Sequence, residues 1–502
     1  MKPSATRRGA CVLAALAMGA APARAQTAES ALPKTESIPT SILLGFESIQ
    51  LPQGEKLGLV GTSVLFQVGE SWGFGPAVYG AASGERGGFF VGGVELQYRA
   101  ALAKNLSLAT GLYAGGGGGG AAPVGSGLML RPAATLLYDL GPAMQVGLSW
   151  SIVKFPSGEI DSRQFGLVFA WRDEYRHYDA GDAGQRVFSG CACGFGFERM
   201  AGSVGTYQFT DGSERRIGLV GVRAERRTGV TGVKLGIEAS AAARGDAAGY
   251  MEILGNAGWS IAPVPEALPS LRLGLRGAFG LGGGGAVPTG GGAIAKAAAT
   301  LEFSPARGWS VGIDGGVVHA LNGTLRARTA QAWIGMDLEP AAGGSSERSA
   351  TVVRTEWTGA LQHHARVERS DGSVQPLDTI GLKLTRYVTP SLYITGQAHS
   401  AYAGGAGAYS IGLLGAGVAT RSDAGRQGAP RVGFEALVGA AGGGGVATSG
   451  GAIAQGVAWA GWGSSANSEW RVGLGAERSL HGALRSPIVE LSWTRAFGLA
   501  GG

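Results

Sequence analysis

The stretch Ser162-Arg163-Gln164-Phe165-Gly166-Leu167-Val168-Phe169-Ala170-Trp171 alternates along its whole length. Every second residue from Phe165 to Trp171 is large and apolar, whereas the other face, from Ser162 to Ala170, is mostly small or polar. A period of two over about ten residues predicts a β-strand with one apolar face.

The same alternation recurs in residues 143–152, 468–477 and 489–497, with Trp and Phe concentrated near the ends of these segments. Lipid satisfies no backbone hydrogen bonds, so only helices or closed sheets cross a membrane. A soluble β-sandwich also alternates, but here the less apolar face carries mainly Gly, Ala and Ser rather than charged side chains. The pattern therefore favours a transmembrane antiparallel β-barrel whose apolar face meets lipid.

The composition is dominated by glycine, with 92 residues among 502, or about 18% against an average of about 7%. Collagen is excluded because there is no G-x-y period, and long helices are disfavoured because each interior Gly costs a helix about 1 kcal/mol relative to Ala. Aromatic residues account for 8% of the chain, which argues against intrinsic disorder.

The N-terminus predicts export. A basic start, an apolar run over 10–21 and the cleavage pattern Ala23-Arg24-Ala25 indicate a signal peptide over 1–25, so that the mature chain begins at Gln26. Loss of the four basic residues of this leader lowers the net charge from +6 to +2. We therefore expect no nucleic-acid partner and a place in the bacterial outer membrane, in contact with its lipid and with the barrel-assembly machinery.

A glycine run recurs three times, at intervals of about 160 residues, and divides the chain into three units. Its copies are Gly117, Gly118, Gly119, Gly120; Gly282, Gly283, Gly284, Gly285; and Gly442, Gly443, Gly444, Gly445. The repeats are predicted over 26–172, 194–338 and 353–502, with polar linkers over 173–193 and 339–352. Each repeat carries about eight strand candidates, so the chain is expected to hold about 24 strands.

Two architectures fit this count: one barrel of about 24 strands, or three tandem eight-stranded barrels. An even number of strands per repeat places every linker on the periplasmic side in both. The long linkers favour separate barrels. However, an eight-stranded barrel must fill its interior with side chains, and the many small inward residues are poor filler. We therefore favour the single wide barrel.

The glycine runs lack the Gly-Lys-Ser/Thr of a phosphate-binding loop. Between the fifth and sixth strands of each repeat, glycine permits positive φ, sharp bends and close backbone approach. We interpret the runs as structural, with contact to a glycan or narrowing of a pore as the alternative.

Cys191 and Cys193 are the two cysteines of the mature chain. A C-x-C pair alone does not build a four-ligand zinc site, whereas an oxidising compartment favours a disulfide between the two thiols. No metal and no cofactor is expected.

The segment from Val318 to Gly323, with His319 and Asn322, resembles the His-x-Ser-Asn-Gly segment of outer-membrane lipid A 3-O-deacylases. Those enzymes are eight-stranded barrels that use a His, a Ser and a Glu. The resemblance implies a shared barrel type, although the serine position is Leu321 here.

Three functions follow as hypotheses. We favour a non-enzymatic pore or export conduit for a solute or polysaccharide, with periplasmic export components or a glycan as partners, since adding strands widens a barrel. The second is a lipid-modifying barrel hydrolase centred on His319 and Asn322. The third is a non-conducting structural or surface barrel.

Overall fold

The computed structural model describes residues 32–188, 193–306, 308–338, 349–420, 430–465 and 467–501. The signal peptide predicted over 1–25 and Cys191 lie outside this range. None of the helices in the described ranges is long and apolar enough to span a membrane. Two short 3-10 helices, η1 (Pro52–Gly54) and η2 (Ala180–Asp182), interrupt a chain that is otherwise built from antiparallel strands.

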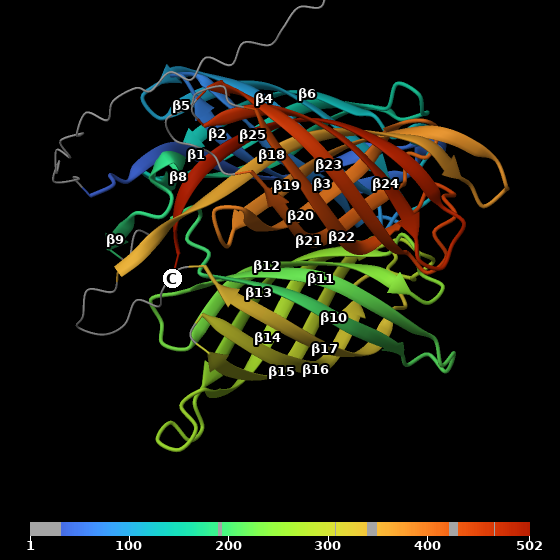
Figure 1. Ribbon diagram of the computed structural model, residues 1–502. Coiled ribbons are helices and arrows are strands. Elements are labelled where there is room, and N and C mark those ends of the chain that lie inside the picture. Colours follow the sequence, from blue (N-terminus) through green and yellow to red (C-terminus); the bar gives the residue numbers. More distant parts are fainter. Residues whose placement is uncertain are drawn as a thin grey trace, which may run out of the picture. The chain divides into compact units, whose positions relative to one another are not determined.

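The strands form three eight-stranded barrels (Figure 1). Barrel 1 contains β1 (Glu36–Gln50), β2 (Lys56–Val68), β3 (Trp72–Ser83), β4 (Phe90–Ala103), β5 (Leu106–Gly118), β6 (Met129–Asp139), β7 (Met144–Lys154) and β8 (Asp161–His177). Barrel 2 contains β10 (Arg199–Phe209), β11 (Arg216–Arg227), β12 (Val233–Arg244), β13 (Met251–Ile261), β14 (Leu271–Gly283), β15 (Ala293–Ala306), β16 (Trp309–Ala320) and β17 (Arg326–Asp337). Barrel 3 contains β18 (Ser349–Glu368), β19 (Val374–Tyr387), β20 (Leu392–Ala403), β21 (Ser410–Ala419), β22 (Arg431–Gly442), β23 (Ala452–Ser465), β24 (Ser468–Ser479) and β25 (Arg485–Gly501).

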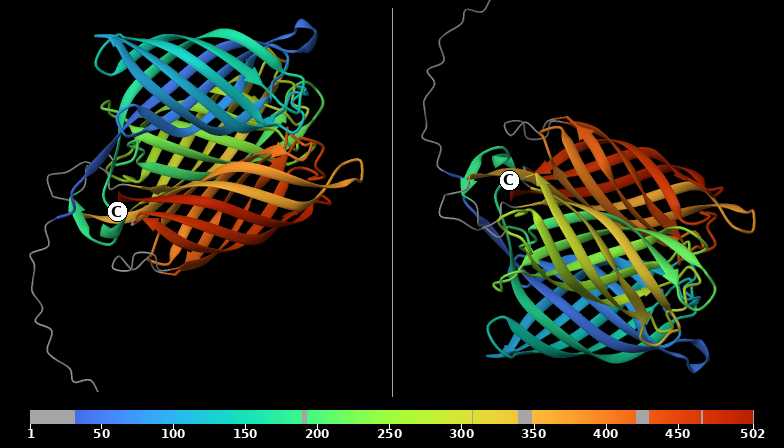
Figure 2. Two further views of the ribbon diagram at one scale, coloured as in Figure 1. Left: turned by 90° about the horizontal axis from the view of Figure 1, so that it is seen from above. Right: turned by 90° about the horizontal axis from the view of Figure 1, so that it is seen from below.

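Each barrel closes on itself. In barrel 1, β1 pairs with β8, so that Ser41 lies opposite Arg172. β10 pairs with β17 in barrel 2, and β18 pairs with both β19 and β25 in barrel 3. The all-β antiparallel barrel class is confirmed, and so is the alternative of three tandem barrels. The single wide barrel that we favoured is wrong, and the two further views in Figure 2 show the three closed sheets.

The alternation seen in the sequence places the large apolar side chains outside. On β8, Phe165 is 77% exposed, whereas Ser162 and Gln164 are buried in the interior. The apolar residues predicted to share a face in 143–152 and 468–477 also point outward. Phe497 is an exception, because it is buried and packs edge-to-face against Tyr175. The apolar side chains of the barrel walls are therefore exposed except where other segments cover them.

The segment expected as a polar linker over 173–193 has regular structure over much of its length. β8 continues to His177, η2 follows, and β9 (Arg186–Phe188) pairs with the start of β18 in barrel 3. Tyr175 packs between Phe66 of barrel 1 and Trp357 of barrel 3, and its hydroxyl accepts a hydrogen bond from the Trp357 indole at 3.1 Å. The segment therefore fastens barrel 1 to barrel 3.

Inward-facing glycines make room for aromatic rings. A methyl group on Gly61 would overlap the Tyr79 ring, and a methyl group on Gly312 would overlap the Trp333 ring. In both cases a ring from the neighbouring strand occupies the space that a larger residue at the glycine would fill. Small inward residues thus serve a filled barrel rather than an open one.

Candidate functional site

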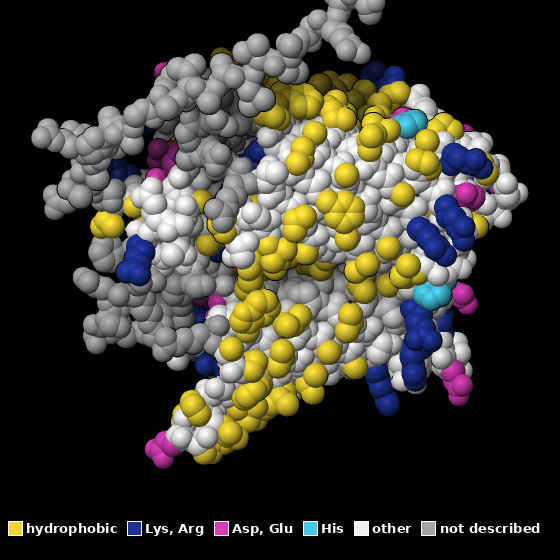
Figure 3. All heavy atoms as spheres, viewed as in Figure 1, with side chains coloured by type: hydrophobic (Ala, Val, Ile, Leu, Met, Phe, Trp, Pro, Cys, Tyr) yellow, Lys and Arg dark blue, Asp and Glu magenta, His cyan; other side chains and the backbone are white. Residues whose placement is uncertain are grey.

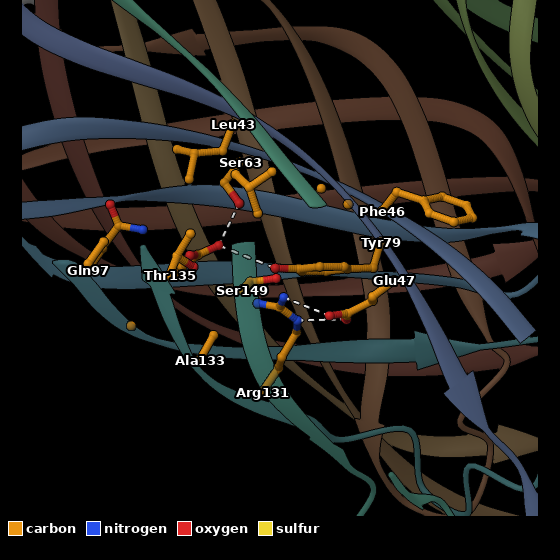
Figure 4. A pocket seen from close by; sticks show the side chains of 16 residues that line it. Leu43, Phe46, Glu47, Ser63, Tyr79, Gln97, Arg131, Ala133, Thr135 and Ser149 are labelled. Atoms are coloured by element: carbon orange, nitrogen blue, oxygen red, sulfur yellow. Dashed lines mark hydrogen bonds and ion pairs between the residues drawn. The ribbon is translucent and has the colours of Figure 1, made fainter. Parts of the chain in front are cut away.

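Barrel 1 is crossed by a buried ion pair. Arg131 on β6 donates two hydrogen bonds to the Glu47 carboxylate on β1, at 2.8 and 2.9 Å, and its guanidinium lies over the Tyr79 ring. Ser63 donates a hydrogen bond to Glu95 at 2.5 Å. Figure 4 shows Glu47, Arg131, Tyr79 and Ser63 pointing toward one another. They line a cavity of about 30 Å³, which is room for one or two water molecules.

Barrel 2 holds a larger network. Arg223 and Arg276 both donate to the Asp314 carboxylate, at 2.6 and 2.8 Å. Lys296 bridges Glu238 and Glu252 at 3.0 Å each. All of these side chains are buried and come from different strands, so the network braces the barrel across its interior.

Barrel 3 repeats the theme with different residues. Lys383 lies between Glu435 and Glu490, at 2.6 and 2.9 Å from their carboxylate oxygens. Arg471 donates to Glu356 at 2.6 Å. An unpaired buried charge is costly, and in all three barrels opposite charges meet across the interior, so each interior is polar and filled.

Sequence reasoning missed these charges because each is a single residue on a face that is otherwise small. Glu47 and Arg131 are 84 positions apart, and only the strand pairing brings them together. The signal that the sequence gives for such pairs is a charged residue at an inward position of an alternating strand.

The end of each barrel opposite the linkers, termed the loop end, is closed by an apolar cap. In barrel 1 the cap comes from the turns, which contribute Leu51, Phe89, Val124, Phe155 and Ile160, all of them almost fully buried. Turn residues of the other two barrels form equivalent clusters. The loops therefore cover the polar interior at this end.

One arginine per barrel holds the cap to the glycine run; we term these Arg86, Arg215 and Arg369 the latch arginines. Arg86 donates to the carbonyls of Gly120 and Ala121 at 3.2 and 3.0 Å, and also to the Glu55 carboxylate. That hydrogen bond lowers the pKa of the Glu55 carboxyl.

The other two latches also reach carbonyls of their glycine runs, although the shorter hydrogen bond of Arg369 goes to the Gly404 carbonyl in the β20–β21 turn, at 2.7 Å. Arg215 donates to the Gly285 and Ala286 carbonyls, at 3.1 and 2.9 Å. Arg369 donates to the Gly444 carbonyl at 3.4 Å. Each latch therefore binds backbone oxygens that the conformation of the glycine run exposes.

The glycine runs begin in the last residues of the fifth strand of each barrel and continue into the turn before the sixth strand. Gly120, Gly285 and Gly444 have φ of 57°, 55° and 58°, a left-handed conformation that favours glycine. A methyl group at each of these positions would also overlap a backbone carbonyl oxygen of the preceding turn, at Arg86, Ala247 and Ala406.

Each run also receives a turn from another barrel. The β3–β4 turn of barrel 1 meets the run of barrel 2, where a methyl group on Gly88 would overlap the Gly284 amide nitrogen, and the Gly87 amide donates to the Gly290 carbonyl further along the same loop at 2.7 Å. The β20–β21 turn of barrel 3 meets the run of barrel 1, where a methyl group on Gly118 would lie 3.1 Å from the Gly407 carbonyl oxygen, and the Gly407 amide donates to the Gly125 carbonyl at 3.2 Å.

A third contact of the same kind links barrel 2 to barrel 3. A methyl group on Gly249, in the β12–β13 turn of barrel 2, would lie 2.8 Å from the Gly443 amide nitrogen of barrel 3. Barrel 1 thus contacts barrel 2, barrel 2 contacts barrel 3, and barrel 3 contacts barrel 1 by the same surfaces. This is the head-to-tail arrangement that closes a ring of like units.

The structure places His319 and Asn322 on the outside of barrel 2 at its loop end, where both are exposed. His319 lies opposite Ala295 and Arg326 across the sheet, and neither of these carries the hydroxyl that a serine nucleophile would supply. The hydrolase hypothesis remains a prediction.

Cys193 is disulfide-bonded, while Cys191 lies outside the described residues, so their pairing stays a prediction. Across the parts of the chain that the structure describes, no three His, Cys, Asp or Glu side chains are grouped to hold a metal ion.

No protein-family model and no curated protein matches the chain. Solved structures that align with it include OpdQ of Pseudomonas aeruginosa, with 9% identity, coverage of 93% of this chain and 98% of that one, and a TM-score of 0.21. OccAB3 of Acinetobacter baumannii has 9% identity, coverage of 92% and 100%, and a TM-score of 0.21. A point mutant of PfeA, the ferric enterobactin receptor of P. aeruginosa, has 9% identity, coverage of 93% and 82%, and a TM-score of 0.27. At these scores the alignments carry no argument, and the barrel assignment rests on the strand pairing.

Proposed function

We propose that the chain is an integral, porin-like protein of the bacterial outer membrane, whose filled barrels open narrow polar solute paths when the cap at the loop end lifts. The observation that supports this most directly is the division of each closed sheet into an apolar outer face and a polar, charged interior. Closed sheets satisfy their backbone hydrogen bonds internally, which a membrane-spanning segment requires. The barrel-assembly machinery is the expected partner for insertion.

The gate in this proposal is the apolar cap with its latch arginines. The ion pairs leave little free space inside the barrels, and the loops cover one end. Passage of a solute therefore requires the cap to lift and water to enter between the paired charges. Since the latches hold the loops through charge-assisted hydrogen bonds, which are stronger than neutral ones, removing them favours the open state.

Conductance in planar lipid bilayers tests the proposal. We expect the native chain to give small, infrequent steps, and a variant with Arg86→Ala, Arg215→Ala and Arg369→Ala to give larger or more frequent ones. A matched control removes the exposed charges Lys104, Arg186 and Arg226 near the linkers and leaves the conductance unchanged. Absence of steps in both the native and the latch-free chain contradicts a solute path.

Absence of conductance steps in both chains would favour a non-conducting structural barrel. The observation behind this alternative is the cavity of about 30 Å³ in barrel 1, which is far smaller than a solute such as a sugar. The two functions share the same fold and differ in whether the interior ever opens.

A further inference from the structure

Barrels 2 and 3 carry exposed arginines on their outer walls at the loop end. We term this set the basic rim: Arg216, Arg326 and Arg328 on barrel 2, and Arg366, Arg478 and Arg485 on barrel 3. On the face drawn in Figure 3, Lys and Arg side chains gather beside hydrophobic walls, at the end away from the C-terminus.

The strand register brings these like charges together. Gln208 on β10 pairs with Arg328 on one side and Arg216 on the other, so the two arginines are two strand spacings, about 10 Å, apart. In barrel 3, Arg478 and Arg485 lie directly opposite each other. Like charges facing each other across a sheet repel, which favours an anion between them.

No acid among the described residues forms an ion pair with a side chain of the basic rim, although the Glu368 carboxylate accepts a hydrogen bond from the Arg485 backbone amide at 2.9 Å. None of its six side chains forms an ion pair or hydrogen bond with any part of the chain that the structure describes. By contrast, Lys154 at the loop end of barrel 1 lies 3.4 Å from Asp161. The basic rim is thus a set of free guanidinium groups on an outer wall.

The position of the basic rim along the strands indicates which ligand it binds. Below Arg485, the outward residues Val489, Leu491 and Trp493 are all exposed and apolar. Eight residues of strand separate Arg485 from Trp493, or roughly 27 Å, which becomes about 20 Å once the strand tilts and so approaches the apolar band of a membrane barrel. The arginines therefore lie at the level of lipid headgroups.

We propose that the basic rim binds the phosphate groups of an anionic, phosphorylated glycolipid in the membrane leaflet at the loop end. The inference rests on the proposed outer-membrane location. Guanidinium groups bind phosphate through paired, charge-assisted hydrogen bonds, and the aliphatic strip below them suits the acyl chains of the same lipid. His319 belongs to this surface, since it lies opposite Arg326.

The test uses the full chain in phosphatidylcholine nanodiscs that contain bisphosphorylated lipid A, with retained lipid A counted by native mass spectrometry. One variant combines Arg216→Gln, Arg326→Gln and Arg328→Gln, and a second combines Arg366→Gln, Arg478→Gln and Arg485→Gln. The control combines Lys104→Gln, Arg186→Gln and Arg226→Gln, which removes the same charge at the linker end.

We expect each rim variant to bind lipid A roughly tenfold to a hundredfold more weakly at the barrel that lacks its arginines, from the usual contribution of basic residues at an anionic surface, so that fewer lipid A molecules are retained per chain. The control should match the native chain. Dephosphorylated lipid A should bind the native chain as weakly as lipid A binds a variant that combines all six substitutions. Equal retention by rim and native chains, or equal binding of dephosphorylated lipid A, overturns the proposal.

The same experiment separates the two proposals. A native chain that inserts, as judged by heat-modifiable gel migration, but does not prefer lipid A overturns the basic rim alone. A native chain that fails to insert into any bilayer overturns the outer-membrane proposal, and the rim proposal with it.

Discussion

At the scale of single residues, the stability of the barrels depends on buried charged side chains, each of which has only a few partners of opposite charge. Arg131 and Glu47 face each other in an interior that offers little water. Removing one partner leaves the other charge buried and unpaired, which is far costlier than losing a surface pair. The stability of each barrel is therefore concentrated in a few side chains.

This gives a matched comparison within barrel 1. We expect Arg131→Ala to lower the free energy of unfolding by about 3–5 kcal/mol. Lys154→Ala breaks a pair whose side chains are 55% and 53% exposed, and it should cost about 0–1 kcal/mol. Urea unfolding in detergent micelles, followed by Trp fluorescence, measures both. Similar costs for the two variants would show that the buried pair does not brace the barrel.

A second comparison concerns two glycines on β16. A methyl group at Gly312 would overlap the Trp333 ring, whereas one at Gly315 would meet nothing within 4 Å. We expect Gly312→Ala to destabilise by about 1–3 kcal/mol through overpacking, and Gly315→Ala to be close to neutral. The same unfolding experiment measures both free-energy changes. An unchanged free energy of unfolding for Gly312→Ala would mean that the Trp333 ring does not lie against that glycine.

The residue scale is where the sequence was least informative. The outward side chains of 162–171 were predictable, because alternation alone assigns their face. The partners of Glu47 and Asp314 were not, because they depend on which strands meet and in which register. The latch arginines gave no signal, since their acceptors are backbone carbonyls.

At the scale of elements, the glycine runs join barrels as well as shape loops. Gly116, Gly291 and Gly442 lack positive φ, yet a side chain at each would strike the backbone of a neighbouring barrel, such as Ser83 in the case of Gly291. Substitution at these positions therefore probes the joints without adding local backbone strain.

We expect Gly116→Val, Gly291→Val and Gly442→Val together to separate the thermal unfolding of the barrels into distinct transitions in calorimetry, where the native chain shows fewer. Gly277→Val is the control, because it lies on a strand of barrel 2 with open space around its added atoms. If the triple variant and the control unfold alike, these three glycines, in and beside the runs, do not couple the barrels.

The position of the glycine runs in the fold could be predicted from the sequence. The recurrence of the runs and their location between the fifth and sixth strands were visible, and glycine indicated close backbone approach. The identity of what approaches was not visible, because the β3–β4 turn of another repeat carries no pattern that marks it as a partner.

At the scale of the whole molecule, the strand class and the threefold division were predictable, but the closure of each barrel was not. The preference for one wide barrel rested on the many inward Gly and Ser positions. In the structure two such positions, Gly61 and Gly312, accommodate the rings of Tyr79 and Trp333, so a small residue inside a strand indicates a large neighbour as readily as an empty lumen.

Disulfide trapping at the closing strands tests the central claim most directly, namely that each repeat closes its own barrel. In membranes from cells expressing a Cys191→Ser, Cys193→Ser background, Ile42→Cys should cross-link with Trp171→Cys, because these residues are paired across β1 and β8 within the reach of a disulfide. Thr358→Cys should likewise cross-link with Thr494→Cys. Closure of a single wide barrel requires β1 to pair with β25. Ile42→Cys combined in turn with Leu491→Cys, Trp493→Cys or Arg495→Cys covers neighbouring registers of that pairing, and none of the three should give a cross-link. Efficient trapping of Ile42→Cys with one of these β25 cysteines, and none with Trp171→Cys, would contradict the three-barrel account.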